Sequence, residues 1–261
     1  MCECANGRLC TRSYKSIKSL AHSHISTFAH SHICTFAHSH ICTLIMYLLF
    51  DFGGVLVDLD RQRVERSFDE IGFDIRPYLG TYKQAGIFSQ LEQGSITEHE
   101  FCNGIRSLCQ QGGGMTDRLC DEAIIAAWES YLTTVPTERL EMLLKIKQNY
   151  SINVLSNTNT IHWRMAEDTF FRYKGLTVDD FFDHIFLSCE LGVEKPAPQI
   201  FEKVVEGMGV PAHDILFFDD SEVNCQAARQ CGLQALIAPA GSEWFKYFDE
   251  YGKLHLPYIQ A

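Results

Sequence analysis

The sequence predicts an α/β fold in which a doubly wound parallel sheet carries an inserted all-helical domain. Five short apolar runs are too continuous to have one face in water, which is typical of buried parallel strands. They are 47–50, 152–155, 184–187, 215–218 and 234–237. Helical segments separate the later runs. Roughly a hundred residues separate the first run from the second, far more than one crossover helix needs, so we expect a second domain there.

Residues 1–45 precede the first predicted strand and contain an eight-residue repeat, AHSHISTF, AHSHICTF and AHSHICTL. Its three His-x-His pairs with nearby cysteines could bind a soft metal. Repeats this short cannot build a core on their own, however. We therefore expect a disordered tail, and a compact domain that begins at Met46.

The long gap between the first two strands shows helical periodicity only. Thr97 and Glu100 form a capping box ahead of an apolar helical stripe. Thr137 is then expected to cap the crossover helix that leads to the second strand. These signals predict an α/β core of residues 46–60 and 137–261 and a helical domain of residues 61–136, with hinges near Asp60 and Pro136.

Two helices of the carboxyl-terminal half have recognisable ends. Pro198 is typical of a first helical position, and Gly209 of a helix end. Ser221 is expected to cap the next helix, which stops before Gly232. These helices alternate with the last strands, as a doubly wound sheet requires.

The composition indicates an acidic globular protein. The formal net charge is −11, and no local basic patch offsets the repulsion of nucleic acid or an anionic membrane. The apolar run 41–50 is too short to cross a bilayer, and no small-residue cleavage site follows it. We therefore expect a cytoplasmic protein that binds neither nucleic acid nor membrane.

The chain has eleven cysteines, five of them within the first 45 residues. In a long chain with no secretion signal, free buried thiols are the better interpretation than a disulfide framework. Cys102 and Cys109, for example, fall on one apolar helical stripe, where packing alone explains them.

Polar residues follow four of the predicted strands, at the point where each strand ends. The carboxyl ends of parallel strands face one crevice, which is where ligands bind. A serine, asparagine or lysine in such a place is ordinarily a cap or a surface residue. Adjacent acids are harder to explain without a shared cation. The residues are Asp51, Ser156, Asn157, Glu194, Lys195, Asp219, Asp220, Ser221 and Asn224.

These residues form four motifs, one after each of the four strands: Asp51; Ser156 and Asn157; Glu194 and Lys195; and Asp219 to Asn224. Taken together, the four motifs resemble those of the haloacid dehalogenase-like (HAD) superfamily, with a helical cap inserted after the first motif, over about residues 46–240. The forms "DFGGVLVD" and "DDSxxN" are most similar to the bacterial branch that includes glucose-1-phosphate phosphatases. The resemblance implies a Rossmann-like core and a magnesium-dependent phosphatase. Its substrate would be a small phosphorylated metabolite such as a sugar 1-phosphate.

The resemblance also implies residue roles at the reacting centre. Asp51 would be the nucleophile that forms an aspartyl-phosphate. Mg²⁺ would be held by Asp51, by Asp220 and by the backbone carbonyl of Gly53, with Asp219 helping from behind or through water.

The resemblance further implies a set of groups that bind the phosphate. The Ser156 hydroxyl and the backbone N–H of Asn157 would hydrogen-bond the phosphoryl oxygens. Lys195 would offset the charge on Asp51 and on the phosphate.

Gly53 departs from the family pattern, in which an aspartate protonates the leaving oxygen and then activates water. The absence of this aspartate is expected to lower the rate by about 10²- to 10⁴-fold. The loss is smallest for substrates with an acidic leaving group, such as an anomeric hydroxyl or the acid of an acyl phosphate. Asp58 and Asp60 could replace this acid but are expected to be solvated hinge residues. Glu92, Glu98 and His99 of the predicted cap are further candidates.

Two other functions stay open. A metal-independent 2-haloacid dehalogenase also lacks the second aspartate, but the Asp219–Asp220 pair favours a bound cation. A phosphate-binding or regulatory protein impaired in catalysis would keep every residue except the missing acid. A phosphomutase fits less well, because it depends on that acid.

Overall fold

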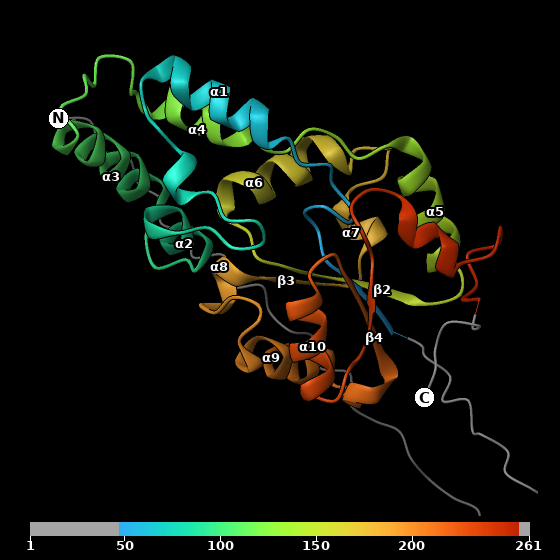
Figure 1. Ribbon diagram of the computed structural model, residues 1–261. Coiled ribbons are helices and arrows are strands. Elements are labelled where there is room, and N and C mark those ends of the chain that lie inside the picture. The colour runs from blue at the N-terminus through green and yellow to red at the C-terminus, as the bar shows by residue number, and fades with distance from the viewer. Residues whose placement is uncertain (1–46, 256–261) are drawn as a thin grey trace, which may run out of the picture. The chain divides into compact units, whose positions relative to one another are not determined.

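The computed structural model describes residues 47–255, which form a five-stranded parallel sheet with helices on both faces. The strand order is β3-β2-β1-β4-β5, so β1 lies at the centre (Figure 1). The strands are β1 (Tyr47–Phe50), β2 (Ser151–Ser156), β3 (His184–Leu187), β4 (Ile215–Asp219) and β5 (Gln234–Ile237). All five predicted strands are present within one residue of their expected ends, which confirms the predicted fold class. The histidine repeat and the start at Met46 lie outside the described residues.

Apolar side chains alternate between the two faces of the central strand and build a core on each. On one face, Phe50 of β1 stacks on Phe218 of β4 with ring centroids 4.7 Å apart, and Trp244 packs edge-on against Phe50. On the other face, Leu49 packs with Phe201 and Phe217. Both faces are therefore dry, which explains the unbroken apolar runs.

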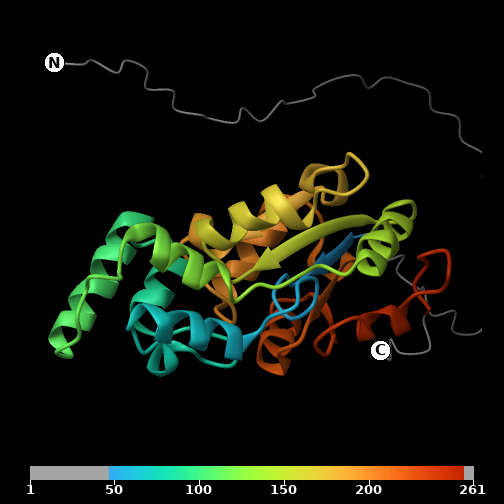
Figure 2. The ribbon, with the colours of Figure 1, turned by 90° about the horizontal axis from the view of Figure 1, so that it is seen from above.

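Different helices cover the two faces (Figures 1 and 2). The Phe50 face is covered by α5 (Thr137–Lys147), η2 (Ala166–Phe170), α7 (Val178–Phe181) and η4 (Glu243–Tyr247). The Leu49 face is covered by α9 (Pro198–Met208) and α10 (Glu222–Gln230). The remaining short elements of this part are α6 (Thr160–Met165), α8 (Ser188–Leu191) and η3 (Ala212–Asp214).

The predicted helix ends are mostly confirmed. Helix α9 starts at Pro198 and ends before Gly209, whose φ of 65° suits glycine. The Ser221 side chain caps α10. The prediction for Thr137 is wrong by one residue, because Pro136 occupies the capping position of α5 and Thr137 is already helical.

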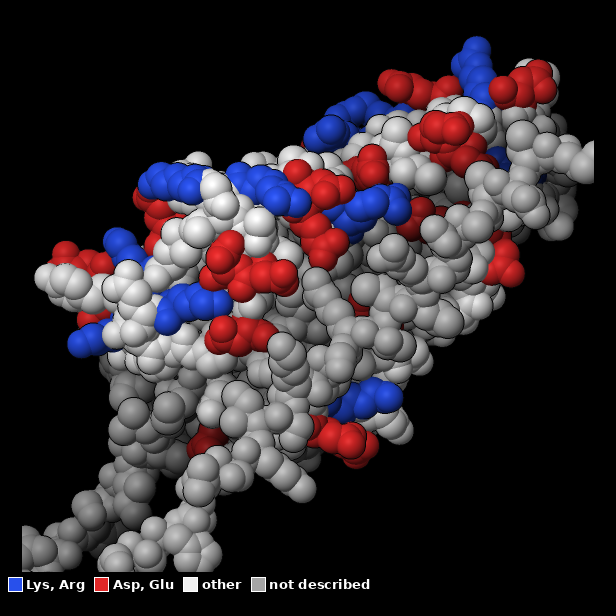
Figure 3. All heavy atoms as spheres, turned by 180° about the vertical axis from the view of Figure 1, so that it is seen from behind, with Lys and Arg blue, Asp and Glu red and all other residues white. Residues whose placement is uncertain are grey.

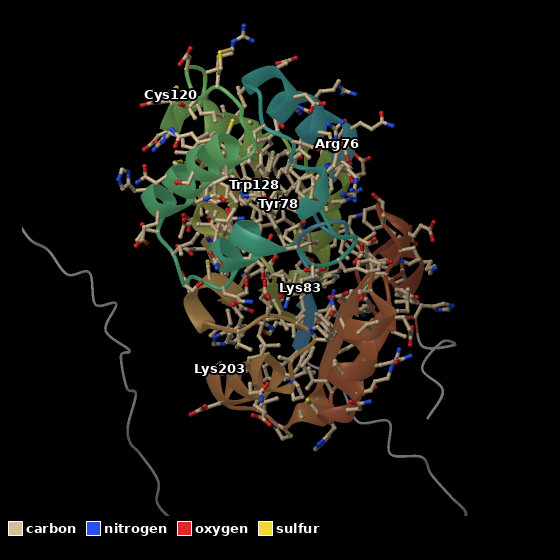
Figure 4. All side chains as sticks on the ribbon, turned by 60° about the vertical axis from the view of Figure 1, so that its left-hand side comes forward. Arg76, Tyr78, Lys83, Cys120, Trp128 and Lys203 are labelled. Atoms are coloured by element: carbon tan, nitrogen blue, oxygen red, sulfur yellow. The ribbon has the colours of Figure 1, made fainter. Side chains whose placement is uncertain are left out.

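Between β1 and α5 lies a layer of helices with its own core, which we call the helical insertion (residues 61–136). Phe88 contacts Phe101 and Trp128 edge-on at its centre. Figure 4 shows Tyr78 and Trp128 inside this layer. The predicted capping box of Thr97 and Glu100 is present. The elements are α1 (Arg61–Ile71), η1 (Arg76–Tyr78), α2 (Gly86–Glu92), α3 (Glu98–Gln111) and α4 (Asp121–Glu129).

The two connections to the helical insertion run side by side. Asp58 exchanges backbone hydrogen bonds with Thr133 and Thr134. Its carboxylate accepts a hydrogen bond of 2.6 Å from the buried guanidinium of Arg139. The Asp60 side chain caps α1 through the backbone N–H of Arg63. Both acids are thus engaged in holding the junction, and their role as hinge residues stays a prediction.

The face shown in Figure 3 carries charges of both signs, and the described cysteines form no disulfides. Acidic and basic side chains are interspersed on the face shown in Figure 3. Within residues 47–255 all six cysteines are free, as predicted, and the other five lie outside this range. The prediction that they are buried is wrong for Cys120, which is exposed, and for Cys189 and Cys231, which are half-buried. No helix in the described part of the chain is both long enough and apolar enough to span a bilayer.

Candidate active site

Asp51 directly follows the central strand, and its side chain is 11 % exposed at the end of the sheet. The backbone N–H of Phe52 donates to Asp51 Oδ1 at 2.7 Å, and the N–H of Asp51 itself donates to the carbonyl of Phe218. Gly54 then turns the loop with a φ of 81°; a Cβ atom there would lie 2.6 Å from Asp220 Oδ2. Glycine thus lets the first loop approach the loop after β4.

Lys195 is 2 % exposed, and its ammonium joins three partners. Lys195 Nζ lies 2.7 Å from Asp51 Oδ1 and 2.7 Å from Asp219 Oδ2, and it donates to the carbonyl of Leu155 at 3.1 Å. Burial alone would lower the pKa of Lys195, but Asp219 and Asp51 outweigh that effect and raise it. The lysine is therefore a fixed positive charge against Asp51.

The backbone of Lys195 is held by a neighbouring loop. The Asn157 side chain accepts a hydrogen bond from the backbone N–H of Lys195 at 2.7 Å and donates to its carbonyl at 2.9 Å. This reciprocal pair joins the loop after β2 to the lysine loop. The predicted role of Asn157 used its backbone N–H only; the role of its side chain was not predicted.

Asp219 is fully engaged inside the protein, with no exposed surface. Its Oδ1 accepts from the backbone N–H of Ser221 at 2.8 Å and from Asn224 Nδ2 at 3.0 Å, while Oδ2 faces Lys195. The structure thus brings together Asp51, Lys195 and Asp219, and gives Asp219 the task of fixing the lysine. This arrangement favours the indirect role in metal binding that was expected of Asp219.

Three carboxylates face one ammonium in this cluster, which fits a divalent cation. Asp51, Asp219 and Asp220 can each offer an oxygen within 4.8 Å of the others. Burial raises the pKa of Asp51 to about 8, with a smaller rise from Asp219 and Asp220 that Lys195 opposes. Burial and Asp219 likewise raise the pKa of Asp220 to about 6. A cation would relieve this excess negative charge, and Asp51 and Asp220 hold the oxygens not already committed to other groups.

A cleft opens over these groups, between the end of the sheet and the helical insertion. Its floor contains all the predicted site residues except Asp219, which lies behind them: Asp51, Gly53, Ser156, Asn157, Lys195 and Asp220. Its other wall contains Thr81, Tyr82, Gln84, Glu92 and Tyr131. Sequence reasoning missed Gln84, which is uncharged, and Tyr131, whose helical spacing with Ile124, Ala127 and Trp128 indicates only packing.

Two candidates for the missing acid lie outside the cleft lining. Glu98 pairs with Arg164 at 2.9 Å, and His99 faces Asp121 at 3.5 Å. Glu92, in contrast, lines the cleft and is 5 % exposed.

Glu194, the residue before Lys195, points to the helical insertion instead of the cleft. Its carboxylate lies 2.7 Å from Lys83 Nζ and accepts a hydrogen bond of 2.8 Å from Gln93. Figure 4 shows Lys83 where the helical insertion meets the sheet. The neighbouring residues Glu194 and Lys195 therefore point to different places: Lys195 contacts Asp51, and Glu194 contacts the helical insertion.

His162, which also lines the cleft, is expected to make the folded protein less stable at acidic pH. It lies 2.9 Å from the carbonyl of Trp128, and burial lowers its pKa from 6.5 to about 4. The unfolded chain therefore binds a proton more readily, so stability from this group is complete above pH 6.5 and lost as the pH falls toward 4. The loss reaches about 3 kcal/mol in the free energy of unfolding.

Urea unfolding of the wild type and of His162→Gln between pH 7.5 and 4 measures this effect. The wild type should lose more stability than the variant over that interval. If the unfolding free energies of the two proteins changed equally with pH, the pKa of His162 would be the same in the folded and unfolded chains, which would contradict this prediction.

Comparisons with known proteins agree with this geometry. The family model of haloacid dehalogenase-like hydrolases matches residues 45–232. D-ribitol-5-phosphate phosphatase of Bacteroides thetaiotaomicron is 32 % identical over 202 residues, which are 77 % of this chain and 95 % of that protein. Glyceraldehyde 3-phosphate phosphatase of Pyrococcus furiosus is 30 % identical over 131 residues, 49 % of this chain and 48 % of that protein.

A solved structure is also similar. It is a HAD family enzyme of Bacteroides thetaiotaomicron in complex with magnesium and inorganic phosphate, with a TM-score of 0.72 and 40 % identity over 78 % of this chain and all of that one. The family match spans strands β1 to β4, the helical insertion and every predicted site residue. The resemblance predicted from the four motifs is thereby confirmed: this chain belongs to the haloacid dehalogenase-like hydrolases.

Proposed function

We propose that this protein is a magnesium-dependent phosphatase of small phosphorylated metabolites that works through an aspartyl-phosphate on Asp51. The observation that carries the proposal is the meeting of Asp51, Lys195 and Asp220 at one cleft. The names of two relatives and the magnesium and phosphate bound in the similar solved structure support it. An acidic chain also suits a small substrate better than nucleic acid or a membrane surface.

The side chains divide the reaction between them. Asp51 attacks phosphorus, the bond to the leaving oxygen breaks, and water then attacks the phosphorus of the aspartyl-phosphate to release phosphate and restore Asp51. Lys195 opposes the rise in the pKa of Asp51 that burial causes and neutralises the phosphoryl oxygens, while Ser156 and the N–H of Asn157 orient them. Asp51, Asp220 and the backbone carbonyl of Gly53 would hold Mg²⁺, which would supply neutralisation of the negative charge of the phosphate when bound.

The leaving group follows from Gly53, which brings no acid to the first loop. A sugar 1-phosphate needs the least protonation, because its anomeric oxygen is a comparatively good leaving group. The relatives named above act on phosphates of another kind, borne on a terminal carbon. Both classes belong in the first substrate series, and faster turnover of anomeric phosphates would support the role given to Gly53.

Removal of magnesium tests the function directly. The full chain with Mg²⁺ should release phosphate from members of this series, stop in the presence of a chelator and recover when excess Mg²⁺ is added. Mg²⁺ alone should also raise the melting temperature, since it binds only the folded site. Halide release from a 2-haloacid with the chelator present, and no phosphate release with Mg²⁺, would contradict the proposal.

Gly53 also favours a second candidate, a phosphate-binding protein that does not turn over. Such a protein would release one equivalent of alcohol, or none, and no free phosphate. A single-turnover measurement of both products, with Asp51→Asn as control, separates it from the phosphatase.

A further inference from the structure

The wall of the cleft opposite Asp51 is polar and belongs to the helical insertion. We propose that Gln84, Glu92 and Tyr131 form a hydroxyl-binding subsite, which takes the polyhydroxylated carbon chain of a polyol or sugar phosphate while Asp51 faces its phosphate. This inference rests on the proposed phosphatase function and names its substrate class.

The three residues come from separate elements but meet at the same cleft. Gln84 lies in the loop before α2, Glu92 is the last residue of α2, and Tyr131 follows α4. Gln84 is 9 % exposed and Glu92 is 5 % exposed. The Gln84 side chain lies close enough to Tyr131, and the Gln84 backbone close enough to Glu92, to oppose the rise in the pKa of each group. They therefore form one connected group.

Gln84 has an acceptor that the protein does not use. Its Oε1 atom is buried and finds no hydrogen-bond donor among residues 47–255. A buried polar atom left unpaired is costly, and native structures contain few of them. A donor on a ligand in the cleft, such as a hydroxyl, would satisfy it.

Glu92 lies in surroundings that disfavour its charged form. Burial raises its pKa well above the ordinary value, and the carboxylate of Glu194 adds to the rise, while Lys83 opposes it. Lys83 makes its ion pair with Glu194 rather than with Glu92. A neutral carboxyl both donates and accepts hydrogen bonds, and it does not repel a phosphorylated substrate.

The resulting subsite presents acceptors and donors in one small space. The Gln84 carbonyl accepts, whereas the Glu92 carboxyl and the Tyr131 hydroxyl each donate and accept. Each hydroxyl of a polyol chain also donates and accepts, so it can pair with any of them. An unsubstituted alkyl chain would leave all of them unpaired, which is how a polar site rejects an apolar analogue.

Two substrates with the same type of leaving oxygen test the subsite: D-ribitol 5-phosphate and n-pentyl phosphate, each with Mg²⁺ and the full chain. We expect kcat/KM of the wild type to be about 10- to 100-fold higher for D-ribitol 5-phosphate. Tyr131→Phe and Gln84→Met should each raise KM for that substrate about tenfold and leave kcat/KM for n-pentyl phosphate within about threefold.

Tyr78→Phe is the matched control, because Tyr78 packs within the helical insertion, outside the cleft lining. Turnover of neither substrate by the wild type would contradict the phosphatase itself. Equal kcat/KM for the two substrates, or equal losses on both in Tyr131→Phe and Gln84→Met, would overturn the subsite and leave the phosphatase standing. Loss of kcat on both substrates in Glu92→Gln, with an aryl phosphate unaffected, would make Glu92 a proton donor and also overturn it.

Discussion

Asp51→Asn should lower kcat for phosphate release by about four to six orders of magnitude, the scale on which hydrolases lose turnover without their nucleophile. An amide cannot form the aspartyl-phosphate, so no route through the covalent intermediate remains. The fold should persist, because the amide oxygen can still accept from the backbone N–H of Phe52, and Lys195 keeps its partner Asp219. Steady-state phosphate release and the mass of the intact protein after acid quenching measure the two effects.

Asp60→Asn is the matched control for this change. Asp60 lies nine residues further along and caps α1, and asparagine is an equally good cap. This variant should keep wild-type turnover and melting temperature. Turnover by Asp51→Asn near that of the wild type, or a phosphorylated protein that lacks Asp51, would contradict the assignment of the nucleophile.

Lys195→Met should damage both stability and catalysis. The ammonium is the cation shared by two buried carboxylates, Asp51 and Asp219, and its removal leaves them to repel each other. Breaking a buried ion pair by removing one partner costs about 3–5 kcal/mol in the free energy of unfolding. Loss of a fixed charge at the phosphoryl group should also lower kcat about 10²- to 10³-fold.

Urea unfolding and steady-state kinetics measure these two losses, and Lys203→Met on the exposed side of α9 is the control (Figure 4). Mg²⁺ should recover part of the stability of Lys195→Met, because it places positive charge beside Asp51. If the unfolding free energy of Lys195→Met matched that of Lys203→Met, Lys195 would not hold the carboxylates as the structure indicates.

The sheet and most of the reacting centre could be predicted from the sequence for one physical reason. Parallel strands covered on both faces must be apolar throughout, so 215–218 and the other runs stand out. The residue that ends each run is then placed at a common edge. This geometry brings Asp51 near Asp219 although 168 positions separate them in the numbering.

Other features depend on contacts that no local pattern encodes. The grip of Asn157 on the backbone of Lys195 joins two loops whose separation is known only after both have folded. Gln84 lies in an irregular loop, where neither periodicity nor charge marks it. A smaller error concerns the start of α5. Thr137 has the right chemistry for a helix cap, but Pro136 occupies the capping position and Thr137 is the first helical residue.

Gly54 carries a consequence for the history of this loop. Its left-handed backbone disfavours any other residue, and a Cβ atom would lie 2.6 Å from Asp220 Oδ2, so the Asp220 carboxylate would have to shift. Any other residue would push Asp220, which follows β4, away from the first loop. Gly54 is therefore constrained by its shape as tightly as Asp51 is by its reactivity. Natural variation and laboratory evolution should therefore both spare it, although it offers no functional group of its own.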